Sequence, residues 1–315
     1  MYYLKQQVID TDRAPQAQPG LISAIIPVYQ AKAAHLPKVI AAVEAQQDTS
    51  IEIIVVKNGK FETQLTSSCP MRVFEIDRNV GAAYARNLGA VQAAGEVLWF
   101  IDSDLEAIPA RSAATAARML KADNEIGIIG SIVFNTPEGE VMTIGRKRES
   151  SRCAEDETIL DDDFANTACA FVRAETFFRI KGFADFIEYP FDDVDFGFKV
   201  RAAGLRCVGV RACAGTHPLH GGSNSVFHEF MSFHNMLLHF AISYRPSQFA
   251  ALLQKKAGQG FRLAPPRVRP EPLQRALNLG RSAVGFALAA AYLLLHLPRV
   301  IRLRQTRQAM LRSVT

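Results

Sequence analysis

The fold of this chain is most clearly indicated by Val97-Leu-Trp-Phe-Ile-Asp-Ser-Asp104, where an apolar run ends in two carboxylates. Such a short run of aromatic and branched residues predicts a buried β-strand. Five further stretches predict strands, at residues 22–28, 51–56, 71–76, 127–134 and 205–210.

Helical patterns occur between and after these strands, at residues 34–47, 81–94, 109–122, 191–203 and 227–244. Strands that alternate with helices predict βαβ units and a parallel sheet with right-handed crossovers. We therefore expect an α/β fold. The polar segment of mixed charge at residues 137–160 predicts a surface loop or an edge hairpin.

The composition excludes several classes of protein. With 49% hydrophobic and 21% charged residues, the chain can bury a core, which excludes a disordered or collagen-like protein. A mean hydropathy of +0.04 excludes a polytopic membrane protein. The five cysteines form no Cys-x-x-Cys motif, so core thiols in a reducing cytosol are expected. Residues 1–20 carry no secretory signal pattern and predict a polar leader.

Charge is distributed unevenly along the chain. From Lys255 onward there are 12 Lys and Arg and one acid, whereas the first 254 residues have 24 Lys and Arg and 30 Asp and Glu. Residues 282–298 are 17 consecutive uncharged residues, and five arginines follow them. We expect an apolar helix that lies in or dips into a membrane, with the arginines on anionic headgroups. A core helix with a solvated basic tail and a spanning helix are the alternatives.

The two carboxylates Asp102 and Asp104 directly follow a predicted strand. In an open parallel sheet, ligands bind beyond the carboxyl ends of the strands. Carboxylates one residue apart at such a place can hold Mg²⁺ or Mn²⁺, which take oxygen ligands and share them with phosphates. A turn or a helix N-cap also explains the pair.

Two other segments carry candidate functional residues. Small residues around Gly81 allow close approach of a ligand, and Arg86 can reach a phosphate or a base; a helix packed tightly on a sheet is the alternative. Asp192, Asp193 and Asp195 open a predicted helix. Capping explains acids at this position, but adjacent carboxylates also raise one another's pKa and can provide a general base.

A loop with two histidines, His217-Pro-Leu-His220, precedes Gly-Gly-Ser. Imidazole nitrogens are common metal ligands, although a structural or solvated role explains histidines in loops as well. The spacing leaves open which of the two histidines has a function.

Together and in this order, these segments resemble the family-2 glycosyltransferases of the GT-A fold, over roughly residues 22–223. The matching segments are Ile25-Ile-Pro-Val-Tyr29, Glu52-Ile-Ile-Val-Val56, residues 79–89, Asp102-Ser-Asp104, Gly182-Phe-Ala-Asp185, Asp192-Asp193 and Arg201-Ala-Ala-Gly204. The resemblance implies a Rossmann-like, mostly parallel sheet flanked by helices.

The expected organisation of the chain follows from this resemblance and from composition. A leader at 1–20 precedes a transferase domain at 21–225, with a nucleotide-sugar half at about 21–105 and an acceptor half at about 106–225. A helical extension at 226–257, a Gly/Pro linker at 258–272 and an apolar and basic helix and tail at 273–315 follow.

The resemblance also implies an activity, which is transfer of a sugar, with inversion, from a nucleotide-diphosphate sugar to an acceptor hydroxyl. Asp193 would be the catalytic base, and Asp192 would orient it. Mn²⁺ or Mg²⁺ would bind Asp102, Asp104 and one of His217 and His220. The donor would contact Pro27, Tyr29, Asn58, Gly81, Arg86, Asp102 and Ser103. Asp163 and Asp185 would lie on the acceptor side.

The chain departs from the family at the turn after the second strand, where an Asp usually holds the nucleobase. Lys57-Asn-Gly-Lys60 stands there instead. Either Asn58 takes over the base contact or the base is not uracil, so UDP-, dTDP- and GDP-linked donors all remain possible. Asp192 also replaces the usual Glu.

The basic C-terminal segment suggests where the acceptor lies. We expect a cytoplasmic protein, peripheral on the anionic inner face of the cell membrane, that acts on a lipid-linked glycan or a cell-envelope polysaccharide. The alternatives are a non-catalytic, membrane-docked protein that binds nucleotide sugars and a nucleotidyltransferase. The basic tail lacks interleaved aromatic residues, so nucleic acid is not expected as a partner.

Overall fold

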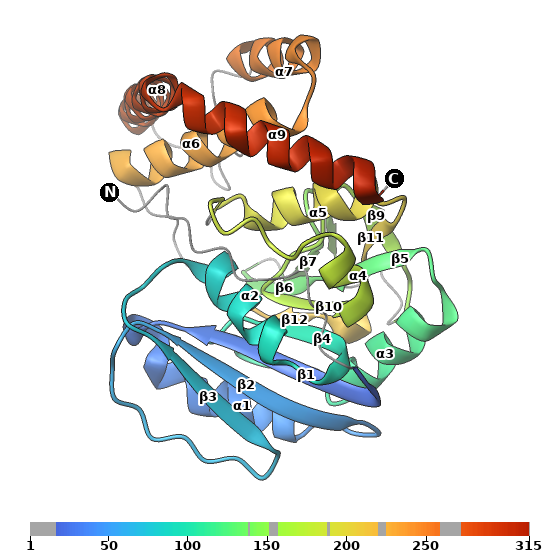
Figure 1. Ribbon diagram of the computed structural model, residues 1–315. Helices are drawn as coiled ribbons and strands as arrows, with labels where there is room; N and C mark the ends of the chain where they lie inside the picture. The colour runs from blue at the N-terminus through green and yellow to red at the C-terminus, as the bar shows by residue number, and fades with distance from the viewer. Residues whose placement is uncertain are drawn as a thin grey trace. The chain divides into compact units, whose positions relative to one another are not determined.

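The computed structural model describes residues 17–137, 139–150, 157–187, 190–219, 225–258 and 272–314 (Figure 1). The chain divides into two compact units. The first contains the residues up to Phe186, Asp192–Leu219 and the last two residues, and the second contains Ile187–Phe191 and His220–Ser313.

An eight-stranded sheet forms the centre of the first unit, in the order β3-β2-β1-β4-β10-β5-β11-β9. β10 runs antiparallel to β4 and β5, and β9 runs antiparallel to β11, whereas the other pairs are parallel. The prediction of a mostly parallel sheet is therefore confirmed. The strands are β1 (Gln18–Val28), β2 (Ser50–Asn58), β3 (Met71–Ile76), β4 (Gly95–Ile101), β5 (Ile126–Gly130), β9 (Leu160–Asp162), β10 (Cys169–Arg173) and β11 (Arg206–Gly209).

Helices cover both faces of this sheet, which explains why its inner strands are continuous apolar runs. α1 (Leu36–Glu44) and α3 (Ser112–Ala122) bury Val39, Val43 and Ala116 in one hydrophobic core. On the other face, α2 (Ala82–Gln92), α4 (Ala174–Arg179) and α5 (Asp192–Ala202) bury Phe177 and Phe196 in a second core. Each predicted helix of this unit is present, and α4 is an addition.

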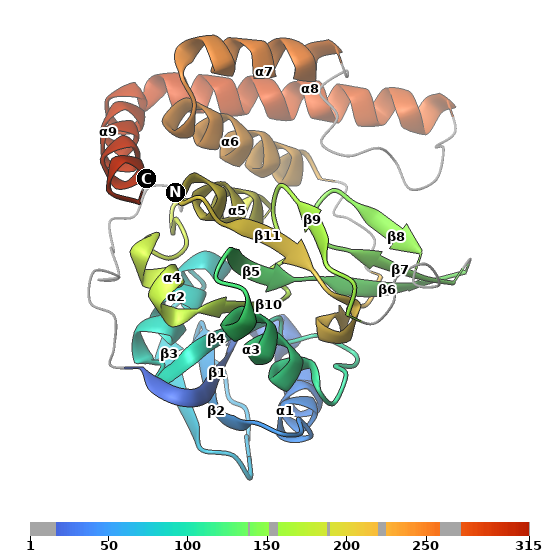
Figure 2. The ribbon, with the colours of Figure 1, turned by 90° about the vertical axis from the view of Figure 1, so that its right-hand side faces the viewer.

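A second sheet of the first unit has the order β12-β6-β7-β8 (Figure 2). Its strands are β6 (Ile132–Thr136), β7 (Gly139–Thr143), β8 (Arg148–Ser150) and β12 (Gly215–Thr216). β7 and β8 pair as the edge hairpin that was one of the two predictions for residues 137–160. The prediction of one strand at 127–134 is wrong in one respect, because the segment forms two strands, β5 and β6, in different sheets. They are separated by Ser131, whose hydroxyl donates to the Val210 carbonyl at 3.0 Å.

The second unit is helical, with α6 (Val226–Ser243), α7 (Pro246–Gly258), α8 (Pro272–Leu295) and α9 (Leu297–Val314). α6 and α8 share a small core around Phe233, Phe240 and Ala289. A Cβ added to Gly285 would lie 2.7 Å from the Glu229 Cβ, so α8 approaches α6 closely at this glycine. The predicted linker at 258–272 falls almost wholly on 259–271, outside the described residues.

Arg304 and Arg307, two of the five arginines expected on headgroups, bind protein atoms instead. Arg304 Nη1 donates to the Tyr244 carbonyl at 2.6 Å, and Arg307 is 4% exposed with Nη1 3.4 Å from Ser243 Oγ. The last carbonyls of a helix lack partners within it and attract cations. Arg304 therefore stabilises the end of α6, and Arg307 binds the side chain of its last residue.

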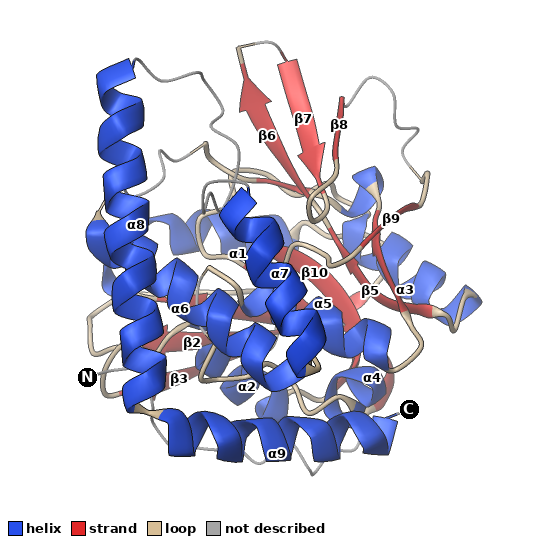
Figure 3. Ribbon diagram, turned by 90° about the horizontal axis from the view of Figure 1, so that it is seen from above, coloured by secondary structure: helices blue, strands red, loops and turns tan. Residues whose placement is uncertain are grey.

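The predicted apolar helix at 282–298 is broken near its end. α8 and α9 meet at His296 with a bend of 82° (Figure 3). Pro298 explains the break, since proline removes a backbone donor and clashes with the preceding helical turn. Within the described residues, no single helix has the length and apolar character to cross a membrane, and Leu279–Leu295 together with Leu297–Val314 passes that test only as a bent pair.

Candidate active site

The carboxylates at the end of β4 meet the segment that follows β12. The Asp102 amide donates to the Ala168 carbonyl at 2.8 Å, and the Glu106 amide donates to the Thr216 carbonyl at 2.8 Å. These bonds hold the 102–107 turn beside the start of the histidine loop. As a result, His217 Nε2 lies 3.8 Å from Asp104 Oδ1.

Asp102, Asp104 and His217 form the one group within the described residues that could hold a metal ion, with one ligand atom of each inside 4.8 Å of the others. His217 Nδ1 lies 2.9 Å from the Pro218 carbonyl. A proton on Nδ1 would donate to this carbonyl and leave Nε2 available as a ligand. The two carboxylates suit Mn²⁺ or Mg²⁺, and the imidazole favours Mn²⁺ over the harder Mg²⁺, so the residues fit a manganese ion. His220 lies outside the described residues.

Arg86 connects this group to the acids of α5. Its guanidinium is 4% exposed, with Nη2 2.8 Å from Asp102 Oδ1 and Nη1 2.6 Å from Asp192 Oδ2. It also lies over the Phe183 ring, 5.5 Å from the ring centre. Nε is buried and has no hydrogen-bond partner among the described residues. The helix carries Arg86 inward because Gly89 lets it approach β1, where an added Cβ would lie 2.4 Å from Ile25 Cγ2. The tight packing that was the alternative explanation for this segment is therefore present as well.

Asp192 and Asp193 occupy the first turn of α5. Asp192 is 6% exposed, whereas Asp193 is partly exposed and accepts a hydrogen bond from the Val194 amide at 2.8 Å. Burial and then the charge of Asp192 raise the pKa of Asp193 to about 7. Burial also raises the pKa of Asp102, although Arg86 and His217 oppose the shift. A carboxyl group with a pKa near 7 can accept a proton at neutral pH, so Asp193 has the property expected of a general base.

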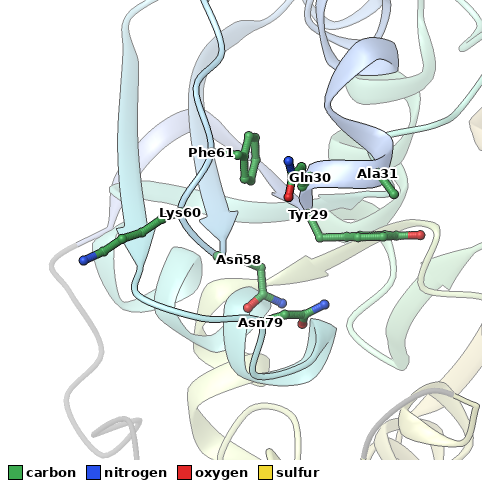
Figure 4. A pocket seen from close by; sticks show the side chains of 8 residues that line it. Tyr29, Gln30, Ala31, Asn58, Lys60, Phe61 and Asn79 are labelled. Atoms are coloured by element: carbon green, nitrogen blue, oxygen red, sulfur yellow. The ribbon is translucent and has the colours of Figure 1, made fainter.

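A cavity of about 480 Å³ opens at the ends of β1 and β2 (Figure 4). Tyr29 and Phe61 give it aromatic walls, and Tyr29 is 41% exposed. The other lining residues are Gln30, Ala31, Asn58, Gly59, Lys60 and Asn79. Such a cavity suits a planar ligand that stacks on aromatic rings.

Asn58, which we expected to contact the donor, holds the backbone around this cavity in place. Asn58 Nδ2 donates to the Gly81 carbonyl at 3.0 Å, and its Oδ1 accepts from the Val80 amide at 2.8 Å. Asn58 thus holds the loop before α2, where Gly81 has a φ of 95°. Pro27 and Ser103 are buried, in β1 and between the two aspartates. Only the remaining N–H and lone pair of Asn58 are left for a nucleobase.

Lys57, which stands near the position where the family has Asp, forms an ion pair with Glu75 of β3 at 2.5 Å. Its ammonium lies 5.1 Å from the centre of the Phe61 ring. Lys57 therefore supports an aromatic wall of the cavity.

The two residues expected on the acceptor side lie apart in the fold. Asp163 forms an ion pair with Arg201 at 3.3 Å, and its side chain is 57% exposed. Asp185 follows Phe183, whose amide and carbonyl both bind the Asn87 side chain on α2. The segment with Asp185 is thus held beside Arg86.

Lys32 is a residue of the site that sequence reasoning missed. It lies on η1 (Gln30–His35), and its Nζ is 2.6 Å from Asp104 Oδ2. The sequence feature that could have identified Lys32 is its position just after the first strand. β1 is the neighbour of β4, and the ends of the two strands meet at one edge of the sheet. A single lysine in an alanine-rich turn gives no signal by itself.

Comparison with known proteins identifies the domain. The model of the family described as glycosyl transferase family 2 matches residues 23–177. The chain contains a family 2 glycosyltransferase domain. The predicted membership is therefore confirmed. The match ends before Asp192, Asp193 and His217, so the roles of these residues rest on the geometry above.

The relatives agree with this identification. An uncharacterized glycosyltransferase of Haemophilus influenzae is 32% identical over 87 residues, which is 27% of this chain and 29% of that protein. GalNAc-T7, solved with UDP, GalNAc and Mn²⁺, has a TM-score of 0.60 and 13% identity, covering 91% of this chain and 62% of that chain. A mannosyltransferase of Pyrobaculum calidifontis, solved with GDP-Man and Mn²⁺, has a TM-score of 0.53 and 18% identity, covering 96% and 88%. These two structures show that the glycosyltransferase domain has the fold of such enzymes.

Proposed function

We propose that this chain is an inverting glycosyltransferase that moves a sugar from a nucleotide-diphosphate sugar to an acceptor hydroxyl. One observation carries the proposal: the buried guanidinium of Arg86 binds both Asp102 and Asp192. Asp102, which can hold a metal, and the Asp192-Asp193 turn, which can take a proton, thus lie on either side of the Arg86 side chain. Transfer from a diphosphate needs both, one for the leaving group and one for the acceptor.

The donor would place its base in the cavity between Tyr29 and Phe61 and its diphosphate toward Asp102 and Asp104. Two structural neighbours, solved with UDP, GalNAc and Mn²⁺ and with GDP-Man and Mn²⁺, support a nucleotide-sugar donor. Asp102, Asp104 and His217 would hold Mn²⁺ or Mg²⁺, which when bound neutralises charge that develops on the leaving diphosphate. The Asn58 amide binds backbone groups and does not select a base, so the proposal includes UDP-, dTDP- and GDP-linked donors.

Asp193 would remove the proton of the acceptor hydroxyl as its oxygen attacks the anomeric carbon. The new bond forms on the face opposite the leaving group, and the bonding pair leaves with the diphosphate oxygen, so the configuration inverts. The transition state would resemble an oxocarbenium ion. Asp192 would keep Asp193 basic by repulsion, and Arg86 would fix Asp192 in place.

We also infer a membrane-associated acceptor, a lipid-linked glycan or an envelope polysaccharide, at the inner face of the cell membrane. α8 and α9 support this, because Leu294 and Leu295 are 71% and 81% exposed and Ile301 is 47% exposed. Arg302 and Arg312 are exposed on the same α9 helix. Apolar side chains next to exposed arginines suit an anionic bilayer surface.

A thermal-shift screen tests the donor site. The full chain is heated with UDP-, dTDP- and GDP-sugars, each with and without Mn²⁺, because a ligand that binds only the folded state raises the melting temperature. We expect one nucleotide to raise it in a metal-dependent way, and Asp102→Asn to remove the metal dependence. No shift with any donor would contradict the proposal, and binding without turnover would favour the non-catalytic alternative.

A further inference from the structure

Each carboxylate of the Asp102–Asp104 pair already has a basic partner. Arg86 Nη2 lies 2.8 Å from Asp102 Oδ1, and Lys32 Nζ lies 2.6 Å from Asp104 Oδ2. Two positive charges therefore lie against the two negative charges that would hold a divalent ion. A metal ion at this site has to compete with at least one of them.

The two basic residues differ in how firmly they are held. Arg86 is 4% exposed and is bound from two sides, by Asp102 and Asp192. The Lys32 side chain is 22% exposed and belongs to η1, none of whose residues is buried. Lysine carries its charge on a flexible stem of four carbons. Lys32 can therefore leave Asp104 without a change in the fold, whereas Arg86 cannot leave its partners.

Lys32 also connects the cavity to the metal ligands. It directly follows Gln30 and Ala31, which line the cavity, and its ammonium reaches Asp104. A donor with its base in the cavity and its phosphates at Asp102 and Asp104 passes beside this side chain. An ammonium displaced from Asp104 is thus within reach of the diphosphate.

We propose that Lys32 is a diphosphate-binding residue that neutralises Asp104 until a divalent ion takes its place. The inference rests on the proposed function. A metal ion bound alone meets repulsion from the ammonium, and an anionic diphosphate between the two cations relieves it. Lys32 therefore opposes binding of the metal alone and favours binding of nucleotide together with metal. This coupling between the two ligands is reciprocal.

Two dissociation constants of the full chain test this role. The first is that of Mn²⁺ alone, from the electron paramagnetic resonance signal of free Mn²⁺. The second is that of UDP or GDP at saturating Mn²⁺, from calorimetry. For Lys32→Met we expect tighter Mn²⁺ binding and weaker nucleotide binding, each by about fivefold or more. A loss of structure would weaken the binding of both Mn²⁺ and nucleotide, so changes in opposite directions identify the proposed role of Lys32.

Two further variants serve as controls. Lys38→Met removes a lysine that is exposed on α1 and should leave both constants unchanged. Lys32→Arg keeps a positive charge and should keep both constants near the wild-type values. If Lys32→Met leaves both constants unchanged or weakens both, the inference is overturned while the donor site stands. If the wild-type chain binds neither Mn²⁺ nor nucleotide, the proposed function itself is overturned.

Discussion

Arg86 and Asp192 form a buried ion pair of 2.6 Å, although 106 positions separate them in the sequence. Because the same guanidinium binds Asp102, this pair joins the sheet edge at β4 to the first turn of α5. The arrangement makes Arg86 a positioning residue for both proposed halves of the reaction.

Removal of Arg86 should therefore affect stability and chemistry together. Arg86→Met leaves the buried Asp192 and the partly exposed Asp102 without this ion pair, and we expect it to lower the free energy of unfolding by about 3–5 kcal/mol. The loss of positive charge should also move the pH midpoint of activity upward, because Arg86 lowers the pKa of Asp193. Urea unfolding and a pH–rate profile measure the two effects. Arg111→Met removes a pair that lies at the surface and should cost less than about 1 kcal/mol. Equal costs for the two variants would contradict a bridging role.

Replacement of the base should separate turnover from binding. For Asp193→Asn we expect kcat to fall by about 10²–10⁴-fold, the usual contribution of general base catalysis. Donor and metal affinity should stay close to wild type, since Asp193 is no part of the Asp102, Asp104 and His217 group. Steady-state kinetics and calorimetry give the two values, with the surface variant Asp48→Asn as control. Near-normal turnover would exclude Asp193 as the base.

The same residue predicts how stability depends on pH. Its pKa of about 7 in the folded protein lies above the ordinary value of 3.8. Between these two values the folded state binds more protons than the unfolded state, so stability falls as the pH rises from about 4 to about 7 and is constant above. Asp193→Asn should remove this contribution and make the protein more stable than wild type at pH 8. Melting temperatures at pH 5 and pH 8 test this, and parallel curves for the two proteins would count against a raised pKa.

The exposed leucines at the end of α8 should decide membrane attachment. Leu294→Glu with Leu295→Glu places two charges at positions that are 71% and 81% exposed, so the small core between α6 and α8 stays intact. We expect this double variant to lose binding to anionic vesicles and to move to the soluble fraction. Val73→Glu, at a position 46% exposed on β3, is the matched control. Unchanged fractionation of the double variant would refute the membrane surface.

Sequence patterns predicted the features that follow from local chemistry. The parallel strands were evident because burial on both faces makes them continuous apolar runs, and Asp102 and Asp104 were found because they end such a strand. β10 was missed because Ala174 continues Cys169–Arg173 directly into α4, with no turn residue between them. Lys32 was missed because its partner depends on which strands are neighbours, which no local pattern records.

The division at Ser131 escaped prediction for a similar reason. The run from Gly127 to Phe134 is apolar throughout except for Ser131, and the chain changes sheets at this residue, whose hydroxyl donates to the carbonyl of Val210 just after β11. In the same way, the joint binding of Asp102 and Asp192 by Arg86 needs the tertiary fold, although each residue was singled out.

The central claim is inverting transfer from a nucleotide-diphosphate sugar, and proton NMR of donor turnover tests it most directly. The full chain is mixed with Mn²⁺ and α-linked UDP- or GDP-sugars, and the anomeric signal of the first sugar product is recorded, with water as acceptor if no other is known. We predict that a β-configured sugar appears first and that Asp193→Asn forms none. An α-configured first product, or intact donors throughout, would contradict the claim.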